Sequence, residues 1–180
     1  MRKIYVDCGS FKGKSIKQFR ALFGGDYEIF AFDPFVVREY AGMTFFKKAV
    51  WVEDCKMPLY VNTKKRNAGS SLFKEKITGK LNKDNPVEVE CVDFSRWIRD
   101  NFDPTDYIVL KMNIEGSEYP VLNKMIEDGT IDYIDRLYLS FHYEKIGLSK
   151  EEHDKLVSAL KALKTTTVYH SLMNEKESLL

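Results

Sequence analysis

The sequence predicts an α/β fold in which one mostly parallel sheet is covered by helices on both faces. The chain has 180 residues, of which 44% are hydrophobic, and this is enough for a single domain with one core. Apolar runs rich in β-branched and aromatic residues alternate with segments of helical period. In the run YIVLKMN at 107–113, the residues before Lys111 are all hydrophobic, as expected for a central strand. Strands that alternate with helices are typical of a doubly wound parallel sheet.

Seven apolar runs are predicted as strands. In chain order they are IYVDC (4–8), YEIFAF (27–32), TFFKKAVWV (44–52), VEVECVDF (87–94), YIVLKMN (107–113), RLYLSFH (136–142) and TTTVYH (165–170). The stretch WVEDCKMPLYVN (51–62) interrupts the alternation with helices. It predicts two short strands around a turn at Asp54 to Pro58, which we expect to form an antiparallel β-hairpin inserted at the sheet edge.

Three helices are indicated by apolar spacing and by capping residues. Residues 14–23 place Ile16, Phe19, Leu22 and Phe23 on one face. Ser117 is expected to cap a second helix, which ends before Gly129. Ser149 and Glu152 form a capping box ahead of a third helix.

Composition argues against several classes of protein. The formal net charge of +1 argues neither for nor against a polyanionic partner, and nucleic acid is disfavoured, though not excluded, because no stripe of alternating aromatic and basic residues is present. The three cysteines are widely spaced and lack a Cys-x-x-Cys pair, so neither a disulfide framework nor a zinc site is expected. The N-terminal residues do not resemble a signal peptide, and no run reaches the ~20 apolar residues of a membrane span. We therefore expect a cytoplasmic protein that does not enter the membrane; its oligomeric state is not predicted.

Residues 63–84 are predicted as a basic loop within this single domain of residues 1–180. The segment holds seven positive and two negative side chains. Two interpretations remain open. The loop is either a solvated surface segment or a lid over an anionic ligand, because functional residues often lie on long loops.

The most informative short stretch is VDCGSFKGKS at 6–15. Gly9 and Gly13 enclose three residues, one fewer than a phosphate-binding P-loop requires. The second predicted strand ends at Asp33, 24 residues after Gly9, where a carboxylate can accept hydrogen bonds from ribose hydroxyls. A dinucleotide would require a further turn glycine. S-adenosylmethionine carries no phosphate and fits this turn better, although a nicotinamide-dependent oxidoreductase remains the alternative.

Two stretches resemble the FkbM-type methyltransferases. YIVLKMNIEGSEYPVL (107–122) resembles the Leu-Lys-Ile-Asp-Val-Glu-Gly-x-Glu signature of that family. YVDCGSFKGKS (5–15), together with FAFDPF (30–35), is similar to its Asp-x-Gly-Ala-Asn-x-Gly turn and its Ala-Phe-Glu-Pro second strand. NAGSSLF (67–73) and VECVDFSRWI (89–98) are similar in position and kind. The resemblance extends from about residue 4 to about residue 142.

The resemblance implies a class I, Rossmann-like methyltransferase that uses S-adenosylmethionine and commonly methylates a hydroxyl. Carried over by position, the cofactor-binding residues would be Asp7, Gly9, Ser10 and Gly13 at the methionine end, Asp33 and Pro34 at the ribose, Ala49 and Val50 at the adenine, and Asn113. Lys111, Asn113, Glu115 and Glu118 would surround the transferring methyl group.

Two departures from the family pattern carry expectations of their own. Asn113 stands where the family usually has Asp, and because an amide is a poorer ligand for a hard cation, no metal is expected. The sequence extends about ten residues past TTTVYH, so the usual final antiparallel strand pair is expected to be shortened or absent.

Methyl transfer to a hydroxyl needs a group that removes the proton. The catalytic candidates are Glu115, just past the fifth predicted strand, and His142, just past the sixth, with Asn113 beside them. The acceptor is expected to be a small or glycan-like molecule, and the basic loop favours an anionic one. A catalytically silent binding module on the same fold is the third alternative, which Asn113 favours because an amide cannot act as a base.

Overall fold

The central sheet consists of six parallel strands in the order β3-β2-β1-β7-β8-β9. The computed structural model describes residues 1–35 and 42–169. The strands are β1 (Lys3–Cys8), β2 (Glu28–Phe32), β3 (Met43–Phe46), β7 (Tyr107–Met112), β8 (Arg136–Leu139) and β9 (Thr166–Tyr169). The predicted central strand, now β7, lies between β1 and β8, and five of its six residues are apolar. The prediction of a parallel sheet is thus confirmed.

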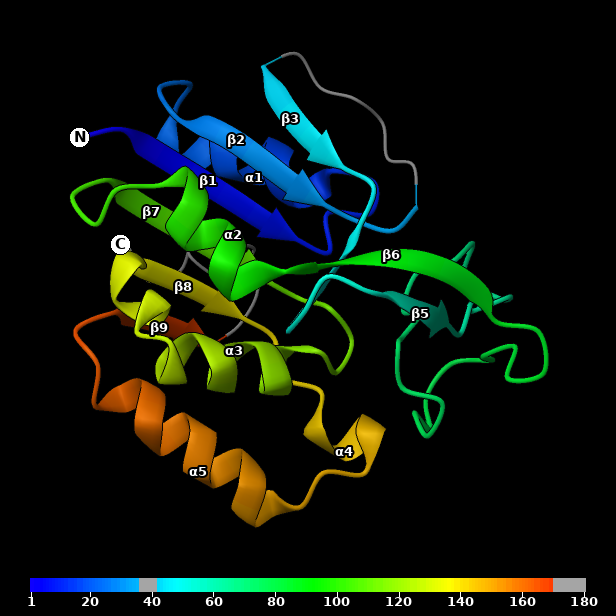
Figure 1. Ribbon diagram of the computed structural model, residues 1–180. Coiled ribbons are helices and arrows are strands. Elements are labelled where there is room, and N and C mark those ends of the chain that lie inside the picture. Colours follow the sequence, from blue (N-terminus) through cyan, green and yellow to red (C-terminus); the bar gives the residue numbers. More distant parts are fainter. Residues whose placement is uncertain (36–41, 170–180) are drawn as a thin grey trace.

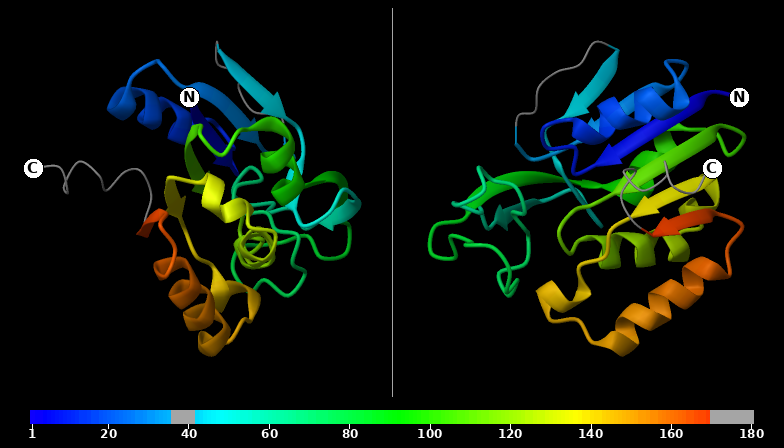
Figure 2. Two further views of the ribbon diagram at one scale, coloured as in Figure 1. Left: turned by 60° about the vertical axis from the view of Figure 1, so that its left-hand side comes forward. Right: turned by 180° about the vertical axis from the view of Figure 1, so that it is seen from behind.

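Helices cover both faces of this sheet, as predicted (Figure 1, Figure 2). α1 (Lys14–Phe23) packs on one face, where the ring of Phe19 stacks on Tyr5 with centroids 3.8 Å apart. α2 (Phe94–Asn101), α3 (Glu118–Glu127) and α5 (Lys150–Lys161) bury their apolar residues in the core on the other face. The short helices η1 (Thr130–Tyr133) and α4 (Tyr143–Ile146) lie in connections.

A second sheet has three strands and corrects the predicted hairpin of residues 51–62. β4 (Ala49–Trp51) and β5 (Lys56–Leu59) both form, but they do not pair with each other. β6 (Val87–Asp93) lies between them, parallel to β4 and antiparallel to β5. The hairpin prediction failed because a seven-residue strand that comes later in the chain offers hydrogen-bonding edges on both of its sides. An antiparallel pair therefore does form in this region, but the partner of β5 is β6.

The predicted run TFFKKAVWV also divides in two. Its first half forms β3, which pairs with β2 in the central sheet, and its second half forms β4 in the smaller sheet. Lys47 and Lys48 separate the two halves. This division carries the chain away from the sheet edge and over the carboxyl ends of the central strands, where β5, β6 and the connection between them lie (Figure 1).

Of the two predicted serine caps, one forms and the other does not. Ser149 and Glu152 form the expected capping box of α5. Ser117 precedes α3 but makes no side-chain cap, since its backbone is already helical at φ −70° and ψ −8°. The carboxylate of Glu118 instead accepts the backbone N–H groups of Ile114 and Gly116, each at 2.7 Å. The predicted shortening of the final antiparallel pair falls on residues 170–180, outside the described part of the chain.

Gly9 fixes the distance between the turn after β1 and the end of β7. Its φ is +79°, and a Cβ atom added there would lie 2.1 Å from the carbonyl oxygen of Asn113. The N–H of Asn113 donates to the carbonyl of Cys8 at 3.1 Å, so the two segments continue the β1–β7 pairing beyond the strands. Only glycine combines this backbone conformation with so close an approach.

We predict that Gly9→Ala destabilises the fold more than Gly129→Ala, which serves as its matched control. Gly129 has a similar φ of +71° but nothing within 4 Å of an added Cβ. The control should lose about 1–2 kcal/mol from its left-handed backbone, and Gly9→Ala a further ~1–3 kcal/mol from the clash. Urea unfolding measures both values, and equal losses would show that the contact with Asn113 is unimportant.

Candidate functional site

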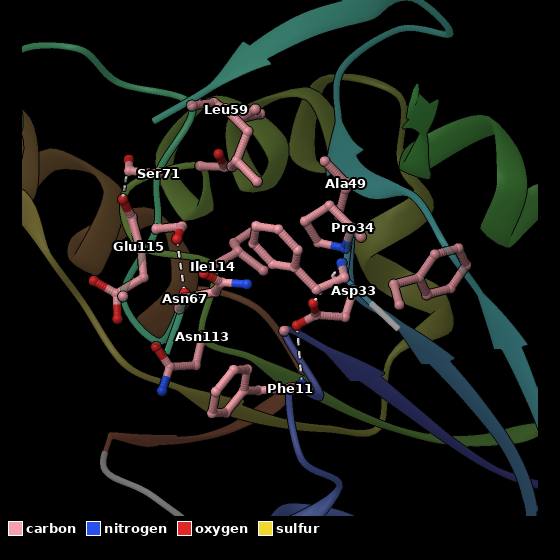
Figure 3. A pocket seen from close by; sticks show the side chains of 18 of the residues that line it. Phe11, Asp33, Pro34, Ala49, Leu59, Asn67, Ser71, Asn113, Ile114 and Glu115 are labelled. Atoms are coloured by element: carbon pink, nitrogen blue, oxygen red, sulfur yellow. Dashed lines mark hydrogen bonds between the residues drawn. The ribbon is translucent and has the colours of Figure 1, made fainter. Parts of the chain in front are cut away.

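A pocket opens beyond the carboxyl ends of β1, β2 and β7, where open parallel sheets bind their ligands (Figure 3). The empty space of the pocket amounts to about 830 Å³ when the part open to solvent is included. The central sheet provides one wall. β4, β5 and residues 67–72 of the connection between β5 and β6 provide the other.

The structure brings most of the predicted site residues to this pocket and leaves the others outside it. The predicted residues that line the pocket are Gly9, Asp33, Pro34, Ala49, Val50, Asn113 and Glu115. The predicted residues that do not line it are Asp7, Ser10, Gly13, Lys111, Glu118 and His142. The contacts with a ligand that were predicted for both groups remain predictions.

Asp33 is held at the end of β2 by two backbone groups. One carboxylate oxygen accepts the N–H of Phe11 and the other the N–H of Phe35, each at 2.9 Å. The side chain is 7% exposed and faces the pocket (Figure 3). Burial raises the pKa of Asp33, although the hydrogen bonds from Phe35 and Phe11 and the nearby Lys111 oppose this. Each carboxylate oxygen has two lone pairs, so the group can still accept bonds from a ligand.

Asp7 has a structural position beneath the glycine turn. It is fully buried and forms an ion pair with Lys111, whose Nζ lies 2.9 Å from Asp7 Oδ1. The Ser15 hydroxyl donates to its other oxygen. Lys111 Nζ also donates to the carbonyl groups of Gly9 at 2.9 Å and Cys8 at 3.2 Å. The pair therefore sets the path of the turn, from behind the pocket surface.

Two buried polar groups near the turn have no partner within the described part of the chain. They are Oδ1 of Asn113, which lines the pocket, and the hydroxyl of Ser10, which does not. A buried acceptor without a donor costs free energy. Because Asn113 faces the pocket, a hydrogen-bond donor on a ligand could satisfy its oxygen (Figure 3).

The chain after β7 bends sharply at Glu115 and Gly116. Glu115 is one of the non-glycine residues with positive φ, at +57°, and Gly116 has φ +119°. An added Cβ at Gly116 would lie 2.6 Å from the Ile146 side chain. The two bonds from Ile114 and Gly116 to the Glu118 carboxylate hold this bend. Glu115 thus lines the pocket at its edge, from this bend (Figure 3).

Glu118 also positions His142. His142 Nδ1 lies 3.0 Å from Glu118 Oε1, and its Nε2 lies 3.8 Å from Glu115 Oε1. His142 is 7% exposed and Glu118 is fully buried. The imidazole is thus flanked by two carboxylates, one behind it and one at the pocket. Glu115 and His142, two of the three catalytic candidates named from the sequence, are therefore neighbours.

Glu115 has a second partner that sequence analysis did not single out. Lys76 Nζ lies 2.7 Å from Glu115 Oε2 and donates to the carbonyl of Gly69 at 2.5 Å. Burial alone would raise the pKa of Glu115, but the charge of His142, the hydrogen bond and charge of Lys76, and Lys145 together lower it. Glu115 is therefore ionised at neutral pH.

The basic loop predicted at 63–84 contributes directly to the pocket. Asn67 to Leu72 line it, and the Ser71 hydroxyl donates to the backbone carbonyl of Glu115 at 2.8 Å. Lys76 is 3% exposed, whereas the other six cations of the segment, Lys64, Lys65, Arg66, Lys74, Lys80 and Lys83, are exposed. Nothing in the sequence distinguishes Lys76 from the other six.

Comparison with known protein families identifies the class of the chain. The profile of the methyltransferase FkbM domain matches residues 18–164, most of the chain. The protein therefore belongs to the FkbM methyltransferase family, which confirms the resemblance drawn from the sequence. The match begins after the glycine turn of residues 9–13, so the family model does not cover this turn. The conformation of the turn is known from the structure alone. No curated protein and no solved structure matches the chain.

Two further properties concern only residues 1–35 and 42–169. No helix there is long and apolar enough to span a membrane. Across the same residues, no group of three or more His, Cys, Asp or Glu side chains could hold a metal ion.

We predict that Lys76→Met loosens the wall of the pocket formed by residues 67–72. The change leaves the Glu115 carboxylate without its closest cation. Because Glu115 is 23% exposed, water recovers part of the cost, so we expect a loss of about 1–3 kcal/mol, below the usual value for a broken buried pair. Urea unfolding and cleavage by chymotrypsin between residues 60 and 86 measure the effect.

Lys74→Met is the matched control for that prediction, since Lys74 is exposed in the same segment. It should leave both the unfolding free energy and the cleavage rate unchanged. A Lys76→Met protein that behaves like this control would show that the ion pair does not hold the segment.

Proposed function

We propose that the protein is an S-adenosylmethionine-dependent methyltransferase that methylates a hydroxyl group. The observation that carries this proposal is the position of Asp33. Its carboxylate closes β2 at the pocket, next to a glycine turn. In a chain of the FkbM methyltransferase family, this arrangement matches a cofactor with a ribose and without a diphosphate.

The residues present fit the parts of that cofactor. Asp33 would accept hydrogen bonds from the ribose hydroxyls, beside Pro34. Ala49, Val50, Leu59 and Leu72 form an apolar wall suited to the adenine ring. The unpaired Oδ1 of Asn113 would accept a bond from the ammonium group at the methionine end. When bound, the cofactor supplies an electrophilic methyl group.

The proton of the acceptor hydroxyl would be removed by a group of three side chains, Glu115, His142 and Glu118. His142 Nδ1 contacts the Glu118 carboxylate, and this contact directs Nε2 toward the Glu115 carboxylate, 3.8 Å away. A proton taken up by this pair could lie between the Glu115 oxygen and Nε2 once the two atoms approach to hydrogen-bond distance. The two side chains would therefore share the role of general base, with Glu115 nearer the pocket and Glu118 as a positioning residue.

The acceptor class that the charges favour is a small anionic or glycan-like molecule. Six exposed cations lie on the segment that forms one wall of the pocket, and Lys48 lines the pocket itself. Sugar phosphates and acidic glycans are accordingly the first acceptors to test, with neutral sugars as the comparison. The three cysteines are free thiols and lie far apart in the sequence, which is consistent with a reducing compartment such as the cytoplasm.

The two alternatives named from the sequence are separated by experiment. Membership of a methyltransferase family weighs against a nicotinamide-dependent oxidoreductase. A catalytically silent module would bind the cofactor but transfer no methyl group to any acceptor.

We predict that S-adenosylhomocysteine binds the protein and that Asp33→Ala weakens this binding about 10- to 100-fold, since hydrogen bonds to a charged group contribute about 1.5–3 kcal/mol. Isothermal titration calorimetry measures the dissociation constants. Asp26→Ala, on an exposed turn, is the control and should bind like the wild type. Normal binding by Asp33→Ala would refute the ribose assignment. Binding of NADH without any binding of S-adenosylhomocysteine would refute the proposed function.

We predict that Glu115→Gln and His142→Gln lower kcat about 10²- to 10⁴-fold, the usual contribution of general base catalysis. The dissociation constant for S-adenosylhomocysteine should change little. Methyl transfer is measured on the acceptor panel, and Glu151→Gln on the exposed surface of α5 is the control. Unchanged kcat in both variants would exclude them as the base.

A further inference from the structure

Cys55 and Cys91 are directly opposite each other in the smaller sheet. The antiparallel register of β5 and β6 pairs Lys56 with Glu90, and continuing it by one residue pairs the two cysteines. The N–H of Cys91 donates to the carbonyl of Cys55 at 2.8 Å, which confirms the continued register. Thirty-six positions separate the two residues in the sequence, so their proximity could not be seen there.

The geometry of such a pair is compatible with a disulfide. Opposite residues of an antiparallel hydrogen-bonded pair have Cα atoms about 5.5 Å apart, within the range of about 4.4–6.8 Å that disulfides span. Both side chains lie on the same face, in the apolar cluster that also holds Ala49, Leu59 and Leu72. All three cysteines of the chain are free thiols in this structure.

The two thiols differ in a way that assigns them separate roles. Cys91 is 2% exposed, whereas Cys55 is partly exposed and can meet a reagent from solvent. Burial first, and then the charge and hydrogen bond of Cys55, raise the pKa of Cys91 to about 12. Cys91 is therefore the protonated partner, and Cys55 is the thiol that reacts first. The third cysteine, Cys8, is fully buried in β1.

We propose that Cys55 and Cys91 form a reversible dithiol–disulfide site that reacts with low-molecular-weight disulfides such as oxidised glutathione. The Cys55 thiolate attacks one sulfur of glutathione disulfide and releases a first glutathione thiolate. Cys91 then loses its proton and attacks the Cys55 sulfur of the mixed disulfide, which releases the second glutathione. Two protein thiols are oxidised and one glutathione disulfide is reduced to two thiols. The proposal is independent of the proposed methyltransferase function.

The test starts from the fully reduced, folded protein. It is incubated with excess glutathione disulfide, and acid then stops the exchange. The remaining thiols are alkylated, the protein is digested, and the peptides are analysed by mass spectrometry. The expected result is the loss of two hydrogens from the intact chain, one alkylated residue at Cys8, and a linked peptide pair that contains Cys55 and Cys91. Dithiothreitol should restore all three thiols.

Variants assign the order of the two steps. In Cys91→Ser, the adduct should stop as a glutathione mixed disulfide at Cys55. In Cys55→Ser, the buried Cys91 should stay unmodified. Cys8→Ser is the matched control and should form the same disulfide as the wild type. Three free thiols in the treated wild type, a link that involves Cys8, a link between two chains, or a mixed disulfide that persists in the wild type would each overturn the proposal.

Discussion

The ammonium group of Lys111 determines the path of the chain at the end of β1. It pairs with Asp7 and binds the carbonyl groups of Cys8 and Gly9, so one side chain from β7 fixes three consecutive residues of its neighbour strand. A buried ion pair is a weak source of stability, but its directional bonds specify one geometry. That geometry places Gly9 against Asn113 and brings the Phe11 N–H to Asp33. The floor of the pocket follows from this one interaction.

Glu118 has the corresponding role at the end of β7. A residue with positive φ such as Glu115 costs of order 1–3 kcal/mol unless its surroundings hold it. The two backbone bonds to Glu118 provide that constraint, and the same carboxylate orients His142. One fully buried acid thus shapes a bend and fixes an imidazole. The expected serine cap at residue 117 is absent because the backbone of Ser117 is already helical.

Local patterns predicted the sheet, its helices and most of the pocket because parallel strands must end at one edge. Asp33, Asn113 and Glu115 follow strands, so their convergence was foreseeable. The role of β6 was not foreseeable, since its partner strands lie far away in the sequence and such pairing leaves no trace in short-range periodicity. Lys76 was missed for a related reason, because one of seven similar cations is chosen only by the tertiary path of the segment. The ion pair of Asp7 with Lys111 was also not foreseen, and the predicted contact of Asp7 with the cofactor stays a prediction.

The two walls of the pocket are held in different ways, and both meet at Glu115. The sheet wall rests on continuous strand pairing and on the main core. The opposite wall is attached through the Ser71 hydroxyl on the Glu115 carbonyl and through Lys76 on the Glu115 carboxylate. Neutralising that carboxylate removes the charge that attracts Lys76, while the Ser71 bond to the backbone remains. Glu115 is therefore the residue through which the wall of residues 67–72 and His142 both contact the sheet side of the pocket.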